Sequence, residues 1–141
     1  PVLLSDMVAK VTETLLPLAS KRRITIHSQF GGEVAVSGNA SLLEKAVHNI
    51  LSNAICHSPE GAEVRIRLAP SVLTVTNTGT FIPEEDLPLL FEPFYRVEKS
   101  RNKSTGGSGL GLYLVKAILE LHGFRYRVEN TERGVVFTVM F

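Results

Sequence analysis

Two asparagines one helical turn apart are the first side chains of this sequence that are suited to chemistry. Asn49 and Asn53 stand at i and i+4 in a segment of helical periodicity, and His57 follows after four more residues. This spacing places all three on one face of a helix, beside its apolar stripe. Amide groups there can bind a metal ion, a water or a phosphate. A polar face turned to solvent explains the same pattern, so both interpretations stay open.

A second candidate is the segment Asn77-Thr78-Gly79-Thr80-Phe81-Ile82, which directly follows a predicted strand. An acceptor side chain that leaves a strand ahead of a glycine can contact the edge of a nucleotide base. The same residues also suit an ordinary turn, which is the better interpretation of this segment when it is taken alone.

The third candidate is a glycine cluster at the start of a predicted helix, formed by Gly106, Gly107, Gly109 and Gly111. Glycines let backbone N–H groups approach phosphate oxygens, and the positive end of the helix dipole points to the same place. A P-loop would need a Lys after the glycines, and a dinucleotide fingerprint would need a buried strand before them. A protein-kinase loop would need a strand and a downstream Lys. This cluster has none of these features.

The stretch of residues 98–108, which includes the first two of these glycines, contains no apolar side chain but has Lys99, Arg101 and Lys103. It is too polar to pack against a core, so we expect a mobile loop. A basic loop that leads into glycines and a helix indicates a lid over phosphates.

The surrounding elements follow from apolar periodicity. A first helix is predicted over residues 4–19, with Pro17 limiting its far end. A second begins at a cap at Asn39 or Ser41 and ends before Pro59 and Gly61, and a third covers residues 110–122. In the third helix one side carries Leu110, Leu114, Ile118 and Leu121. A short helix is predicted over residues 84–90.

Strands are predicted in three successive pairs, each read as a hairpin: residues 24–30 with 33–37, 64–68 with 72–75, and 125–130 with 135–141. Helices alternate with these pairs along the chain. We therefore predict an α+β fold, a two-layer sandwich of a mixed, mostly antiparallel sheet with three main helices on one face.

Bulk composition restricts the function further. With 141 residues, the chain suits one domain spanning residues 1–141. Its 15 basic and 14 acidic residues give a net charge of +1, which provides no overall attraction to nucleic acid. A single cysteine, Cys56, excludes an internal disulfide. No apolar run is long enough to span a bilayer, and a start at Pro1 is expected for a piece cut from a longer protein.

Four motifs in order resemble those of the sensor histidine kinases. The segment from Asn49 to Ala54 looks like their N box, and Asn77 to Ile82 is similar to their G1 box. Leu90-Phe91-Glu92-Pro93-Phe94-Tyr95-Arg96 looks like the F box, and Gly107-Ser108-Gly109-Leu110-Gly111-Leu112 like the G2 box. The resemblance covers essentially the whole chain.

This resemblance implies a Bergerat-type fold that binds ATP with Mg²⁺ between the N-box helix and the lid. It implies that Asn53 is the Mg²⁺ ligand, that Asn49 contacts phosphate or a metal-bound water, and that Asn77 accepts from the adenine amino group beside Gly79. The catalytic set is Asn49, Arg96 and Arg101. The remaining implied nucleotide contacts are His57, Ile82, Phe91, Tyr95, Arg96, Lys99, Arg101, Gly107, Gly109, Leu110, Gly111 and Leu112.

The implied reaction is transfer of the γ-phosphoryl group to a histidine on a separate dimerisation domain. None of His27, His48, His57 and His122 lies in a segment that resembles the phosphoacceptor helix, so autophosphorylation of this piece is not expected. The implied partners are that dimerisation domain and a response regulator. The implied parent is a bacterial homodimer anchored in the membrane, with this domain in the cytoplasm and monomeric when isolated.

Three positions depart from the family's pattern. Asn77 stands where Asp is usual, and a neutral amide lacks charge assistance worth about 1 kcal/mol. Phe81 replaces a usual glycine, and Cys56 stands where many members have a basic residue. These departures motivate an alternative, a degenerate nucleotide-binding or docking module without phosphotransfer.

A related ATPase class that includes gyrase and chaperone proteins resembles this family in fold. Those enzymes place a water-activating Glu one helical turn before the metal-binding Asn, where this chain has Asn49. Transfer to a separate acceptor is therefore favoured over ATP hydrolysis.

Overall fold

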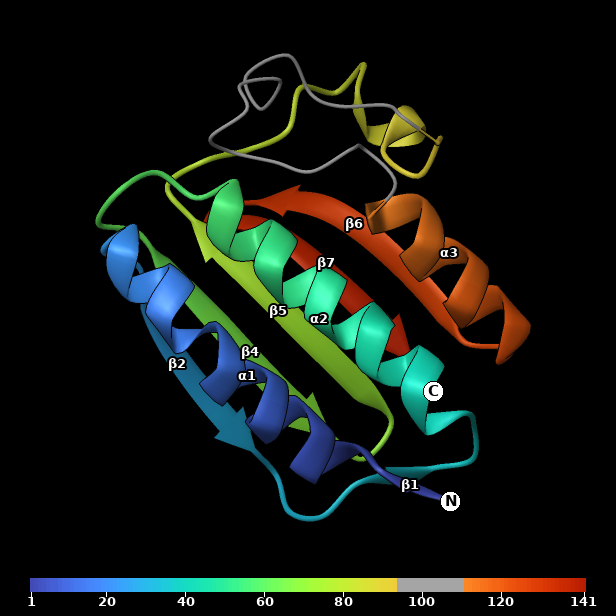
Figure 1. Ribbon diagram of the computed structural model, residues 1–141. Helices are drawn as coiled ribbons and strands as arrows, with labels where there is room; N and C mark the ends of the chain where they lie inside the picture. The colour runs from blue at the N-terminus through green and yellow to red at the C-terminus, as the bar shows by residue number, and fades with distance from the viewer. Residues whose placement is uncertain (94–110) are drawn as a thin grey trace.

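The protein, seen in a computed structural model that describes residues 1–93 and 111–141, has two layers (Figure 1). In the described residues, three long helices cover one face of a five-stranded sheet. The helices are α1 (Leu4–Lys21), α2 (Ala40–Cys56) and α3 (Gly111–Leu121), with a short 3-10 helix, η1 (Leu87–Leu89). The sheet contains β2 (Thr25–Phe30), β4 (Glu63–Ala69), β5 (Val72–Thr78), β6 (Arg125–Thr131) and β7 (Gly134–Met140). The predicted two-layer α+β architecture is confirmed.

The strands of this sheet lie in the order β2-β4-β5-β7-β6. All neighbouring strands are antiparallel except β2 and β4, which run parallel. The predicted hairpins β4–β5 and β6–β7 are confirmed. The last strand, β7, lies inside the sheet, between β5 and β6.

The predicted hairpin of residues 24–30 with 33–37 is wrong. The strand β2 pairs in parallel with β4, from Thr25 opposite Glu63 to Phe30 opposite Leu68. The short β3 (Ala35–Val36) pairs instead with β1 (Val2–Leu3), which the sequence pattern did not predict. A parallel pair needs a crossover connection, and α2 provides it.

The core fills the space between the sheet and the helices. Along β4, Val64, Ile66 and Leu68 are at most 2% exposed, whereas Arg65 and Arg67 between them face solvent. This alternation is typical of a strand with one covered face. Helix α2 lies between α1 and α3 and buries an apolar stripe at helical spacing that includes Leu43, Val47, Ile50 and Ala54.

Two helix predictions are corrected. Helix α1 continues past Pro17 to Lys21, and the turn after Pro17 still packs on the core, because Ala19 is only 1% exposed. The predicted short helix over residues 84–90 shortens to the 3-10 turn Leu87–Leu89. Within residues 1–93 and 111–141, no helix has both the length and the hydropathy that crossing a bilayer requires.

The apolar side of α3 is also displaced from the predicted stripe. Val115, Ile118 and Leu119 are buried, whereas Leu114 and Leu121 are 43% and 72% exposed. Both sets recur at helical spacing. Packing against α2 and β6 decides which set is covered, so periodicity alone identified the helix but not its buried face.

Candidate nucleotide-binding site

The C-terminal end of α2, the end of β5 and the start of α3 lie together at one end of the sandwich (Figure 1). These are the elements that carry the described parts of the N-box, G1-box and G2-box motifs. Segments 49–54, 77–82 and 111–112 are distant in sequence, and the fold brings them to one place.

Helix α2 presents Asn49 and Asn53, which are both half-buried. The helix begins at Asn39, whose side chain accepts a hydrogen bond from the Leu42 N–H over 3.0 Å, as the predicted cap requires. The Asn49 Nδ2 lies 3.5 Å from the carbonyl oxygen of Gly111, a contact at the upper limit of a hydrogen bond. It joins the N-box helix to the first residue of α3.

Arg22 holds the C-terminal end of α2, a role that the sequence analysis missed. Its Nε donates to the Ile55 carbonyl over 3.2 Å and its Nη2 to the Ser58 carbonyl over 2.9 Å. A cation at a helix C-terminus satisfies carbonyls that lack intrahelical partners. Arg22 is remote from α2 in sequence, so no local signal indicated this contact.

His57 is the C-cap residue of α2, and its N–H donates to the Asn53 carbonyl over 3.0 Å. Cys56, the last residue of the helix, is partly buried. Burial raises the pKa of the Cys56 thiol, although the nearby Arg22 opposes this effect. Burial therefore favours the neutral form of this thiol.

Asn77 lies near the end of β5 and is only 7% exposed. It stands in one row across the sheet between Val64 of β4 and Val135 of β7. The next residue, Thr78, accepts a hydrogen bond from the Glu63 N–H through Oγ1 over 2.9 Å.

Two glycines permit this arrangement around Asn77. Gly79 has φ of +77°, a conformation that favours glycine, and begins the loop that leaves the sheet. Gly134, opposite Thr78 on β7, also has positive φ and leaves no room for a Cβ, which would overlap the Asn77 carbonyl oxygen. No local pattern in the sequence indicated this role for Gly134.

The far end of that loop is held by Asn130 of β6, a second residue that the sequence analysis missed. The Ile82 N–H donates to Asn130 Oδ1, and Asn130 Nδ2 donates to the Ile82 carbonyl, both over 2.8 Å. An Asn inside a predicted strand is unusual, and this low strand propensity was the available signal.

Phe91 packs onto the sheet. Its ring lies edge-on to Tyr126 and Phe137, with centroids 5.0 Å and 5.9 Å apart. These contacts hold Phe91 against β6 and β7. Of the G2-box residues, Gly111 is exposed and Leu112 is half-buried.

The other predicted site residues lie outside the described residues: Phe94, Tyr95, Arg96, Lys99, Arg101, Lys103, Gly106, Gly107, Gly109 and Leu110. The predicted lid, residues 98–108, lies there too. In residues 1–93 and 111–141, no three His, Cys, Asp or Glu side chains gather as a metal cluster would require.

Comparison with known proteins agrees with this arrangement. Residues 38–141 match the family of histidine kinase-, DNA gyrase B- and HSP90-like ATPases. The chain is 37% identical over 141 residues to the sensor histidine kinase CusS of Escherichia coli O6:H1 (strain CFT073), which covers 97% of this chain and 29% of CusS. The chain thus spans less than a third of that relative.

Two solved structures are similar to this chain over nearly their whole length. The mycobacterial sensor histidine kinase MprB has a TM-score of 0.85 at 30% identity, covering 98% of this chain and 94% of that one. A nucleotide-free catalytic domain of the histidine kinase ThkA has a TM-score of 0.79 at 26% identity, covering 96% and 91%. The chain therefore belongs to the histidine kinase-, DNA gyrase B- and HSP90-like ATPase family, within which it is the catalytic, ATP-binding domain of a sensor histidine kinase.

Proposed function

We propose that this domain binds ATP with Mg²⁺ and donates the γ-phosphoryl group to a histidine on a separate dimerisation domain of its parent kinase. The bond from the γ-phosphorus to the bridging oxygen breaks, a bond to an imidazole nitrogen of the acceptor forms, and ADP leaves. The observation that carries this proposal is that the C-terminal end of α2, the end of β5 and the start of α3 lie at one end of the sandwich; these segments contain Asn53, Asn77 and Gly111.

The α2 amides fit a magnesium-bound triphosphate. Mg²⁺ prefers oxygen ligands and usually takes few from the protein, because phosphates and waters complete its coordination. Within the described residues, no hydrogen bond engages the side-chain amide of Asn53. Its side-chain oxygen is therefore available as the single protein ligand. When bound, Mg²⁺ neutralises phosphate charge. Asn49, one turn earlier, orients a phosphate or a water.

The base lies at the end of β5 in this proposal. The Asn77 side-chain oxygen accepts from the adenine amino group, Gly79 leaves room for the ring, and Ile82 contacts it. The low exposure of Asn77 supports this role, because a buried amide discriminates strongly against a ligand that leaves it unpaired. Phe91 and Tyr95 wall the base.

The lid completes the phosphate site. Arg96 and Arg101, with Lys99, meet the charge of the phosphates, and the glycines at 107, 109 and 111 bring backbone N–H groups to them, flanked by Leu110 and Leu112. His57 lies at the C-terminal end of α2, one turn after Asn53. Transfer rather than hydrolysis follows from Asn49, which offers no carboxylate to activate water.

The partners follow from the sensor kinases that this chain resembles. We propose that the parent is a membrane-anchored bacterial homodimer, that this domain lies in its cytoplasmic part, and that phosphate passes from the acceptor histidine to a response regulator. The isolated domain is monomeric, and nucleic acid is not among its partners.

The experiment is calorimetric titration with a non-hydrolysable ATP analogue, with and without Mg²⁺. We expect magnesium-dependent binding that Asn53→Ala removes and that Ser52→Ala, its neighbour on α2, retains. Adding the acceptor domain of the parent and labelled ATP then tests transfer. Binding without transfer would leave the docking alternative, and no binding at millimolar nucleotide would overturn the proposal.

A further inference from the structure

We propose that Asn130 is a positioning residue for the adenine-binding loop, residues 79–82, which follows Asn77 and Thr78 at the end of β5. This inference rests on the proposed function, because it assigns to Asn130 the task of holding the loop that contacts the base. Asn130 itself does not touch the nucleotide in this proposal. It acts through the backbone of Ile82.

The contact is a reciprocal pair of hydrogen bonds. The Asn130 side chain accepts from the N–H and donates to the carbonyl of the same residue, Ile82, and both distances are 2.8 Å. An amide that faces one residue in this way reproduces the pattern of a strand neighbour. The partners are 48 residues apart in sequence and partly buried, so the contact is tertiary and shielded from competing water.

The position of Asn130 in the sheet explains why this contact controls the loop. Asn77, Val135 and Asn130 stand in one row across β5, β7 and β6. Two strand spacings, about 9.6 Å, separate the first and the last of them. The loop leaves β5 after Thr78 and reaches β6 at Ile82, so it passes over the end of β7 with Asn77 fixed at one end and Asn130 at the other.

Within residues 1–93 and 111–141, the loop has few other fixed points. Gly79 begins it with φ of +77°, and Phe81 inside it is 70% exposed. Glycine lowers the barrier to alternative loop conformations, and an exposed ring adds little packing. The clamp at Ile82 therefore limits the conformations that residues 79–82 can adopt, and so keeps the base pocket formed before nucleotide arrives.

The chemistry of the clamp requires a side chain that both accepts and donates at this reach. Asp in place of Asn130 would keep the acceptor for the Ile82 N–H but would set a carboxylate against the Ile82 carbonyl. Ala would remove both bonds. Asn130→Ala and Asn130→Asp therefore form a graded pair that distinguishes the two halves of the contact.

The test is calorimetric titration of wild type and both variants with non-hydrolysable ATP and GTP analogues. We expect Asn130→Ala to weaken ATP-analogue binding about tenfold, since two hydrogen bonds that preform the pocket are lost. Asn130→Asp should fall between this variant and wild type. The preference for adenine over guanine should decrease in the same order, whereas the magnesium dependence, which is assigned to Asn53, should remain.

Asn39→Ala is the matched control. This variant also removes an asparagine side chain that accepts from a backbone N–H. Asn39 lies at the N-terminal end of α2, whereas the proposed site lies at the C-terminal end of that helix. Asn39→Ala should lower the melting temperature but leave affinity and base preference unchanged. If the wild type binds the ATP analogue and neither Asn130 variant changes the affinity or the base preference, this inference alone is overturned. If the wild type does not bind, both this inference and the proposed function are overturned. If Asn130→Ala does not fold, Asn130→Asp decides between the outcomes.

Discussion

The imidazole of His122, just after α3, accepts a hydrogen bond from the backbone N–H of Asn39, the N-cap residue of α2, over 3.0 Å. The other ring nitrogen, Nδ1, lies 2.7 Å from the Ile118 carbonyl oxygen, which can only accept. Nδ1 therefore carries the proton, and Nε2 is the acceptor. One neutral ring thus joins two helices, and Gly38 leaves space for it, because a Cβ there would come within 2.6 Å of the ring.

We expect His122→Ala to lower the free energy of unfolding by about 1–3 kcal/mol, because it removes a tertiary hydrogen bond and leaves the Asn39 N–H without its partner. Urea denaturation measures this change. The control is His48→Ala, which removes an exposed histidine of α2 and should change stability by less than about 0.5 kcal/mol. Equal losses in the two variants would show that the His122 contact is not stabilising.

Gly134→Ala should be severely destabilising, by roughly 3 kcal/mol or more, because the new Cβ would overlap the backbone of Asn77 and come within 2.9 Å of the Thr78 Cα. Gly32→Ala is the matched control. Gly32 also has positive φ, +112°, but a Cβ there meets nothing within 4 Å. The stability lost in Gly32→Ala should therefore reflect backbone strain alone. Thermal unfolding of both variants checks the prediction, and a similar loss in both would contradict it.

Asn77→Asp should tighten binding of adenine nucleotides about fivefold, since a carboxylate accepts a stronger, charge-assisted hydrogen bond. The same change should lower the melting temperature without nucleotide, because this position is only 7% exposed and a charge there is desolvated. Titration with ATP and GTP analogues measures the effect. Guanine has a carbonyl in place of the adenine amino group, so the affinity for the GTP analogue should not increase. Equal gains for both bases would contradict the role assigned to Asn77.

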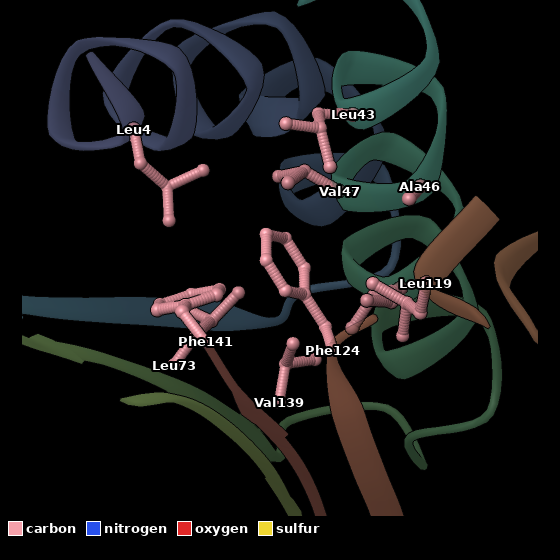
Figure 2. A pocket seen from close by; sticks show the side chains of 10 residues that line it. Leu4, Leu43, Ala46, Val47, Leu73, Leu119, Phe124, Val139 and Phe141 are labelled. Carbon is pink, nitrogen blue, oxygen red and sulfur yellow. The ribbon is translucent and has the colours of Figure 1, made fainter. Parts of the chain in front are cut away.

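A small apolar cavity lies between the start of α2, α3 and the sheet, and Val47 and Phe124 face into it (Figure 2). We expect Val47→Ile to raise the free energy of unfolding by about 0.8 kcal/mol, because one methylene fills space that is now empty. Val115→Ile adds the same group at a buried α3 position outside the cavity lining and should destabilise by about 1 kcal/mol or more. Denaturant titration distinguishes the two, and the cavity assignment fails if Val47→Ile is the more destabilising.

Burial, together with the hydrogen bond from its hydroxyl to Glu120 at 2.7 Å, raises the pKa of Tyr126 to about 12. The folded state therefore keeps this phenolic proton more tightly than the unfolded state. The resulting stability is fully present below about pH 10 and is lost as pH rises towards 12. We expect Glu120→Gln to lower the pKa of Tyr126, as followed by phenolate absorbance.

Tyr126→Phe identifies which absorbance transition belongs to this residue. If that transition has the same midpoint in Glu120→Gln as in wild type, the carboxylate does not contribute to the raised pKa.

Elements whose signals are local were predictable from the sequence. The Asn39 cap, the apolar stripe of α2 and the turn between β4 and β5 all depend on residues within a few positions of one another. The spacing of Asn49 and Asn53 likewise placed both on one helix face. Motif order then related the separated parts of the site to one another through the family resemblance.

The remaining features depend on contacts that no local pattern records. Pairing of β2 with β4 in place of β3 is decided by tertiary packing across the α2 crossover. The Arg22 contacts with the end of α2 and the Asn130 contacts with Ile82 join residues more than 30 positions apart. Polar side chains with such partners look in the sequence like ordinary surface residues.

The place of β7 inside the sheet has a consequence for synthesis on the ribosome. A nascent chain releases β2, β4 and β5 well before β7, so β5 waits with an open edge until the final strand arrives. Unpaired strand edges favour aggregation, and chaperones are expected to bind the chain at this stage. Because β7 brings Gly134 against Asn77 and pairs with the strand that carries Asn130, a chain in which β7 is not yet translated cannot form the proposed base pocket. Binding of nucleotide at that pocket therefore requires β7 to have joined the sheet.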